Sequence, residues 1–362
     1  MIQNRKSNME LLRIVAMLLI VVHHLVINGI DYSSAIEIAP NSLLCVLGAI
    51  FEPICIIGVN LFFLLSGYFQ IKFTWKKWIR IVLELYAYMF IIQTFGVIIG
   101  YSQLNLETIK AIIWPLDSYW FLRVYLFLMV VSPFLNMIVY QLSNQSAKYF
   151  VIIFAVFVCG YAFLKNDGHI GVNRGYSFLF ACCLYLLGAA ISKGLLLQQS
   201  CKSRKWFGCW GIVVICNILF TEIALVVLKS GKLAGVLQVY NSPFVLIESV
   251  CFFMIFVNMK IDDSSLAAKI IRNMSWATLD VYILHSSNKV IPYFRNIPMN
   301  YLVEHGNVAL AYLLVIPYAV IVFLMCIGVA LAFHRTIGCV IKKLSDIVGK
   351  CLEDIQMKIT AR

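Results

Sequence analysis

The chain has 362 residues, of which 62% are hydrophobic and only 13% are charged, and its mean hydropathy is +0.89. Soluble domains carry about twice this charged fraction, so the composition excludes an ordinary soluble protein. Apolar runs of roughly 20 residues recur along the chain, which predicts an all-α polytopic membrane protein.

About ten apolar segments are expected to cross the bilayer. The ninth is short and contains Asp280, His285 and Lys289. The connections are short and show no internal repeat, so residues 1–333 are expected to form one transmembrane domain. Residues 334–362 are expected to form a basic, partly amphipathic tail at the inner surface. The expected spans are 9–29, 44–69, 78–100, 119–141, 148–164, 176–196, 207–229, 241–259, 275–291 and 308–333.

The distribution of Lys and Arg predicts that both termini lie in the cytoplasm, because basic residues concentrate in cytoplasmic loops. With that orientation, the inner loops and the tail contain Arg5, Lys6, Lys72, Lys76, Lys77, Lys148, Lys193, Lys202, Arg204, Lys205, Lys260, Lys269, Arg272, Arg335, Lys342, Lys343, Lys350, Lys358 and Arg362. The outer loops contain only Lys110, Lys165, Arg174, Lys229, Lys232 and Arg295. The net charge of +12 is thus explained by loops beside a lipid bilayer, and no nucleic-acid partner is expected.

The twelve cysteines lie mostly within apolar runs, and no two of them form a C-x-x-C motif. Neither a zinc site nor a disulfide framework is therefore indicated. We expect no bound metal.

The first apolar segment contains a cation and two histidines. Arg13 and His24 are eleven residues apart, close to three helical turns, so they project from one helix face with an axial separation of ~16 Å. With the N-terminus inside, Arg13 lies toward the cytoplasmic leaflet and His24 beyond the midplane. His23 points about 100° away and is expected to serve packing.

Four cations fall within the expected spans, namely Arg13, Arg80, Arg123 and Lys289. Each would cost about 2.5–3.5 kcal/mol at the bilayer centre if unpaired. Pairing within a helix is one explanation, because Glu10 precedes Arg13 by three residues and Glu84 follows Arg80 by four. A functional role of these cations is the other explanation.

Two further stretches permit both a packing and a functional interpretation. Ser66, in GVNLFFLLSGY (58–68), would need a base and an oxyanion site to act as a nucleophile, whereas Gly and Ser commonly pack membrane helices closely. Lys76, Lys77 and Arg80, in KFTWKKWIRIVLELYAY (72–88), form either an ordinary cytoplasmic loop or a phosphate-binding entrance. For the basic stretch the sequence leaves the alternatives level, whereas for Ser66 it favours packing.

Together these stretches resemble the acyltransferase-3 family of bacterial membrane acyltransferases. The matching features are R-x10-H (Arg13 to His24), FF-x-x-SG-Y (62–68), the basic stretch reaching Arg80, WPLDSYWFLRVYLFLMVVSPFLN (114–136) and LDVYILH ending at His285. The resemblance implies ten helices in a bacterial inner membrane and transfer of an acyl group, by expectation acetyl, from cytoplasmic acyl-CoA to a hydroxyl of a surface carbohydrate. Asn60 departs from the family's pattern, since many members have an acidic residue there.

The resemblance and the residue chemistry assign the same roles. His24 and Arg13 are the expected catalytic residues, with His24 as the general base, because a desolvated imidazole stays neutral and can accept a proton. Arg13, Arg80, Lys76 and Lys77 are expected to hold the phosphates of acyl-CoA, a cosubstrate, with no resident cofactor. The same cavity is expected to be lined by Ser66, Trp120, Arg123, Tyr282 and His285.

Two other functions fit a membrane bundle. A transporter or flippase for a lipid-linked glycan would also place charged residues inside the bundle, but such proteins often have paired repeats with broken helices, and none is visible. A non-catalytic sensor domain has no supporting motif.

Overall fold

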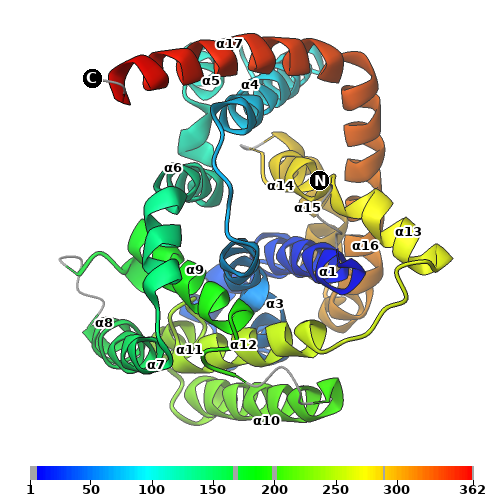
Figure 1. Ribbon diagram of the computed structural model, residues 1–362. Coiled ribbons are helices and arrows are strands. Elements are labelled where there is room, and N and C mark those ends of the chain that lie inside the picture. Colours follow the sequence, from blue (N-terminus) through cyan, green and yellow to red (C-terminus); the bar gives the residue numbers. More distant parts are fainter. Residues whose placement is uncertain (1–5, 166–169, 198–201, 288–289, 361–362) are drawn as a thin grey trace.

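The computed structural model describes residues 6–165, 170–197, 202–287 and 290–360, and all regular structure within them is helical (Figure 1). Lys289, one of the four expected intramembrane cations, lies outside these residues. Seven helical segments are long and apolar enough to cross a membrane: Ser7–Gly29 (α1 with the π-helical end η1), Leu43–Phe69 (α3), Trp75–Ile98 (α4), Trp120–Gln141 (α6), Asn144–Lys165 (α7, η3 and α8), Ser203–Val227 (α10 and η6) and Val308–Thr336 (α16).

Shorter helices complete the bundle. Two of them, Phe178–Ser192 (α9) and Pro243–Val257 (α12), are apolar and coincide with the sixth and eighth expected spans. The others are Tyr32–Ile38 (α2), Leu106–Ile113 (α5), Gly231–Leu237 (α11), Leu266–Ser275 (α13), Thr278–His285 (α14), Val290–Glu304 (α15) and Gly338–Thr360 (α17).

The ninth expected span, 275–291, is not one continuous helix. Its place is taken by α14 and α15, which are separate helices of eight and fifteen residues. An eight-residue helix is about 12 Å long, too short to cross a bilayer. A non-spanning helix end at this depth is tolerated where protein surrounds it, and most of α14 is buried. The expected count of ten spans and the orientation of the termini remain predictions.

Helices α1 and α3 form the centre of the bundle (Figure 1). Glycines allow this close packing, because a Cβ at Gly58 would lie 2.8 Å from the Ala16 carbonyl oxygen of α1. A Cβ at Gly67 would meet the Tyr185 carbonyl of α9. The small residues of the 58–68 stretch thus bring three helices together, which is the packing interpretation of that motif.

Contacts between distant segments define the two ends of the bundle. At the N-terminal end, Asn8 donates to the Phe256 carbonyl at the end of α12, and Lys193 donates to the Val139 carbonyl at the end of α6. At the opposite end, Tyr312 donates to the Leu44 carbonyl at the start of α3. The starts of α6, α9, α12 and α16 therefore lie away from the N-terminus.

The last helix, α17, leaves α16 at Ile337 and crosses α4 at the edge of the bundle (Figure 1). Lys76 forms an ion pair with Asp346, and the Trp75 indole donates to Gln356 at 2.8 Å. The residues expected to form a tail are thus a helix that rests on the start of α4.

Candidate active site

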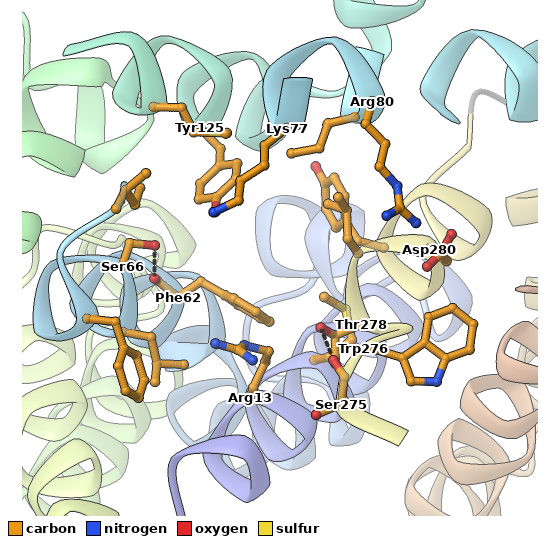
Figure 2. A pocket seen from close by; sticks show the side chains of 18 of the residues that line it. Arg13, Phe62, Ser66, Lys77, Arg80, Tyr125, Ser275, Trp276, Thr278 and Asp280 are labelled. Carbon is orange, nitrogen blue, oxygen red and sulfur yellow. Dashed lines mark hydrogen bonds between the residues drawn. The ribbon is translucent and has the colours of Figure 1, made fainter. Parts of the chain in front are cut away.

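A cavity of about 580 Å³ lies between α1, α3, α4, α6, α14 and α16 (Figure 2). It reaches the N-terminal end of the bundle, because the connection from α3 to α4 forms part of its wall. Its floor includes Met17, Phe121 and Tyr282, which lie deeper in the bundle. The cavity is thus lined by cations near its mouth and by apolar and aromatic side chains further in.

Four basic side chains line this cavity: Arg13, Lys72, Lys77 and Arg80. Figure 2 shows Arg13 and Lys77 directed into it from opposite sides. The ion pairs within the described part of the chain include neither Lys72 nor Lys77. Two uncompensated ammonium groups and two guanidinium groups therefore face one space, which suits an anion.

The two arginines are also held by carboxylates of their own helices. Arg13 Nη1 lies 2.6 Å from Glu10 Oε2, and Arg80 Nε lies 2.8 Å from Glu84 Oε1. The intrahelical pairing therefore exists, but it does not remove the arginines from the cavity. An arginine has five N–H donors, so one carboxylate contact leaves others for a ligand while fixing the side chain's direction.

Sequence reasoning missed a polar cluster on the wall of the same cavity. Asp280 Oδ1 accepts a hydrogen bond from Tyr88 at 2.8 Å and lies 2.9 Å from His334 Nε2. Asp280 and His334 both line the cavity. Asp280 within an apolar segment was a signal that a partner exists, but His334, on another helix, could not be identified from spacing.

His24 lies beyond the floor of the cavity, beside His285. Its Nδ1 atom is 3.1 Å from His285 Nε2, and Ser286 Oγ lies 3.3 Å from the former and 3.1 Å from the latter. Tyr282, on the cavity floor, contacts the His285 ring with centroids 6.0 Å apart. His24 is therefore one aromatic layer away from the cavity rather than on its wall.

The hydrogen bonds around His285 indicate which ring nitrogens of His24 and His285 carry protons. His285 Nδ1 lies 2.6 Å from the Val281 carbonyl, which can only accept, so this nitrogen carries the proton. In the neutral ring, His285 Nε2 is then an acceptor for the proton on His24 Nδ1. The second nitrogen of His24, Nε2, is left with a lone pair, as a general base requires.

The accessibility of these rings differs. His23 and His285 are 6% and 0% exposed, whereas His24 and Ser286 retain partial exposure although they lie deep in the bundle. The outer-loop cation Arg295 is buried, and its Nη1 donates to the His285 carbonyl at 2.6 Å. Arg295 thereby connects α15 to the last residue of α14.

His23 is directed to a different partner. Its Nδ1 atom lies 2.8 Å from the buried Glu52 Oε1 on α3. The two adjacent histidines thus face different groups, as the 100° rotation between neighbouring residues of a helix predicts.

The structure brings some of the expected site residues together and separates others. Arg13, Lys77, Arg80, Ser66 and Tyr282 line one cavity. The Ser66 hydroxyl donates to the Phe62 carbonyl of its own helix at 2.8 Å, and no base accepts from it in the described chain.

The remaining expected residues do not line this cavity. Lys76 faces Asp346 on α17, and the exposed Arg123 lies 3.8 Å from Asp117. Trp120 lies in an aromatic cluster with Tyr176 and Tyr240. Lys72, which was expected only in a cytoplasmic loop, lines the cavity, whereas Lys76 does not.

Comparison with protein-family models identifies an acyltransferase domain, that of the acyltransferase-3 family, over residues 6–335. The match covers nearly the whole chain, so the chain belongs to this family of membrane acyltransferases. Comparisons with curated proteins and with solved structures gave no match.

Proposed function

We propose that this acyltransferase-3 protein transfers an acyl group, in the first instance acetyl, from cytoplasmic acyl-CoA to a hydroxyl of a cell-surface carbohydrate or its lipid-linked precursor. The observation that carries the proposal is the arrangement along α1. Arg13 faces a cation-lined cavity, and His24 lies two turns beyond the cavity residue Met17. Among the described residues, no hydrogen bond engages His24 Nε2.

The cavity supports binding of the donor. Coenzyme A carries phosphates at one end and its thioester at the end of a flexible arm. Lys72, Lys77 and Arg80 lie near the mouth, where they would pair with phosphates. The narrow apolar inner part, with Met17, Phe121 and Tyr282, would hold the arm and direct the thioester toward His24.

The histidine pair would then carry the proton transfers of the reaction. The acceptor hydroxyl gives its proton to His24 Nε2 as its oxygen attacks the thioester carbonyl. The tetrahedral intermediate collapses, the carbon–sulfur bond breaks, and the thiolate of CoA takes the proton back from His24. His285 Nε2 holds the Nδ1 proton of His24 throughout, which orients the ring as the third member of a catalytic triad does.

In this proposal the N-terminal end of the bundle faces the cytoplasm of a bacterial cell, with the chain in the inner membrane. The cavity mouth then meets cytoplasmic acyl-CoA, and the starts of α6, α9 and α12 face outward. The basic loops support this orientation.

The proposal is tested with purified protein, [¹⁴C]acetyl-CoA and a panel of methyl glycosides as acceptors. We expect label in the glycoside and free CoA in equal amounts. CoA-independent movement of a lipid-linked glycan across vesicles, without thioester consumption, would instead identify a transporter.

A further inference from the structure

A second polar site lies around Glu52 on α3, beside His23. Glu52 is 2% exposed. Its Oε1 atom pairs with His23, but Oε2 has no hydrogen-bond partner among the described residues. A buried carboxylate oxygen without a partner is costly, and in native structures such an atom is usually satisfied by a protein group, a water, an ion or a ligand.

Further buried polar atoms also lack a hydrogen-bond partner among the described residues. They include Gln238 Nε2, Asn241 Oδ1 and Ser242 Oγ. The other amide atoms are in use, since Gln238 Oε1 accepts from Tyr32 at 2.9 Å and Asn241 Nδ2 donates to the Val158 carbonyl at 2.9 Å. Each amide is therefore fixed by one atom and presents the other.

Three aromatic rings accompany these atoms. Trp120, Tyr176 and Tyr240 stand at the starts of α6, α9 and α12, and their ring centroids are 4.6 to 5.6 Å apart. Tyr176 is 43% exposed and Tyr240 3%, so the cluster extends from the surface inward. The Glu52 carboxylate is within electrostatic reach of both tyrosine hydroxyls.

The cluster is connected to the proposed base. Glu52 contacts His23, and the rings of His23 and His24 have centroids 5.6 Å apart. Glu52 thus lies beside the two adjacent histidines, whereas Arg13 and the other cations line the cavity that opens at the N-terminal end.

We propose that this cluster is the subsite for the acceptor sugar and binds an uncharged pyranose residue. The apolar face of the ring stacks on Trp120 and Tyr176, and its hydroxyls meet the unpartnered atoms of Glu52 and Gln238. A sugar suits these atoms because each hydroxyl both donates and accepts, and aromatic side chains with a few fixed polar groups are typical of small-molecule sites. This inference rests on the acyl transfer proposed above and names its acceptor site.

The test uses Trp120→Ala, with Trp120→Phe to retain a ring and Trp206→Ala, at the N-terminal end of α10, as the matched control. For acetyl transfer to methyl glycosides, we expect Trp120→Ala to raise KM for the glycoside about tenfold. The KM for acetyl-CoA stays within twofold, and Trp120→Phe recovers most of the loss. Glu52→Gln, which keeps the size of the side chain, also raises the glycoside KM.

A second measurement separates failure of this site from failure of acyl transfer. Saturation-transfer NMR reports binding of the methyl glycoside to His24→Ala protein, which needs no turnover. We expect binding there, and its loss when Trp120→Ala is added. No glycoside binding, or an unchanged glycoside KM in both Trp120→Ala and Glu52→Gln, overturns the subsite. Binding that depends on Trp120 without any consumption of acetyl-CoA by wild type supports the sugar site and overturns the transferase.

Discussion

Lys76 and Lys77 are adjacent in the sequence and differ completely in their surroundings. Lys77 lines the cavity, whereas Lys76 forms an ion pair with Asp346 on α17. Successive residues of a helix are rotated by about 100°, so Lys77 faces the cavity and Lys76 does not. The two lysines appeared equivalent in the sequence because nothing in it indicates that α17 packs against Lys76.

This difference gives a matched pair of variants. We predict that Lys77→Ala raises KM for acetyl-CoA by about three- to tenfold, because one charge-assisted contact to phosphate is lost. Lys76→Ala leaves that KM within a factor of about two, because an exposed ion pair contributes little. Steady-state kinetics with varied acetyl-CoA measures both, and equal effects of the two variants would contradict the assignment.

Arg13 tests whether geometry or charge matters in the cavity. Arg13→Lys keeps the positive charge and the contact with Glu10 but loses the planar group with several donors. We predict a loss of at least about tenfold in kcat/KM for acetyl-CoA, which steady-state assays of the purified variant measure. Near wild-type kcat/KM in Arg13→Lys would show that Arg13 supplies charge alone.

At the scale of elements, the long apolar helices could be predicted from the sequence, whereas the short helix α14, with its buried polar residues, could not. The segments around α1, α3, α4 and α16 agree with the expected spans within a few residues, because apolar length alone determines them. The ninth span differed because α14 is stabilised by partners from distant helices, Tyr88 and His334 among them. Likewise, Glu52 and His23 meet only once α1 and α3 are packed.

Gly349 allows the backbones of α17 and α4 to pack closely. A Cβ at Gly349 would lie 2.8 Å from the Cα of Lys76, so the two backbones must separate if a side chain is added. We predict that Gly349→Ala lowers the thermal midpoint of the detergent-solubilised protein, at a cost of about 1–3 kcal/mol. The control is Gly208→Ala on α10, where a Cβ meets nothing within 4 Å and alanine favours the helix. A midpoint equally raised in both variants would contradict the close contact.

At the scale of the whole molecule, His24 lies between the floor of the cationic cavity, through His285 and Tyr282, and the buried Glu52, through His23. A donor and an acceptor on different sides of a membrane need such an arrangement. The R-x10-H spacing predicted that Arg13 and His24 lie on one helix face, and α1 does extend from the cavity to His24, the proposed base. The contacts of His24 with His285 and Ser286 could not be predicted, because these residues lie 261 and 262 positions away in the sequence.

The proposed orientation is tested by reporter fusions. We predict that a reporter fused after Gln70, in the connection that forms the cavity wall, reads cytoplasmic. A reporter fused after Pro40, between α2 and α3, should read extracytoplasmic. The opposite pair of readings would place the cavity mouth outside and remove cytoplasmic acyl-CoA as the donor.

The most direct test of the mechanism compares His24→Ala with His23→Ala in transfer from [¹⁴C]acetyl-CoA to a glycoside. A general base typically contributes about 10²–10⁴-fold, so His24→Ala should lower kcat by that factor while the Kd for acetyl-CoA stays unchanged. His23→Ala should retain most of kcat, because its ring faces Glu52 rather than the His24–His285 pair. Transfer by His24→Ala at near wild-type rate would contradict the account, whichever end of the bundle faces the cytoplasm.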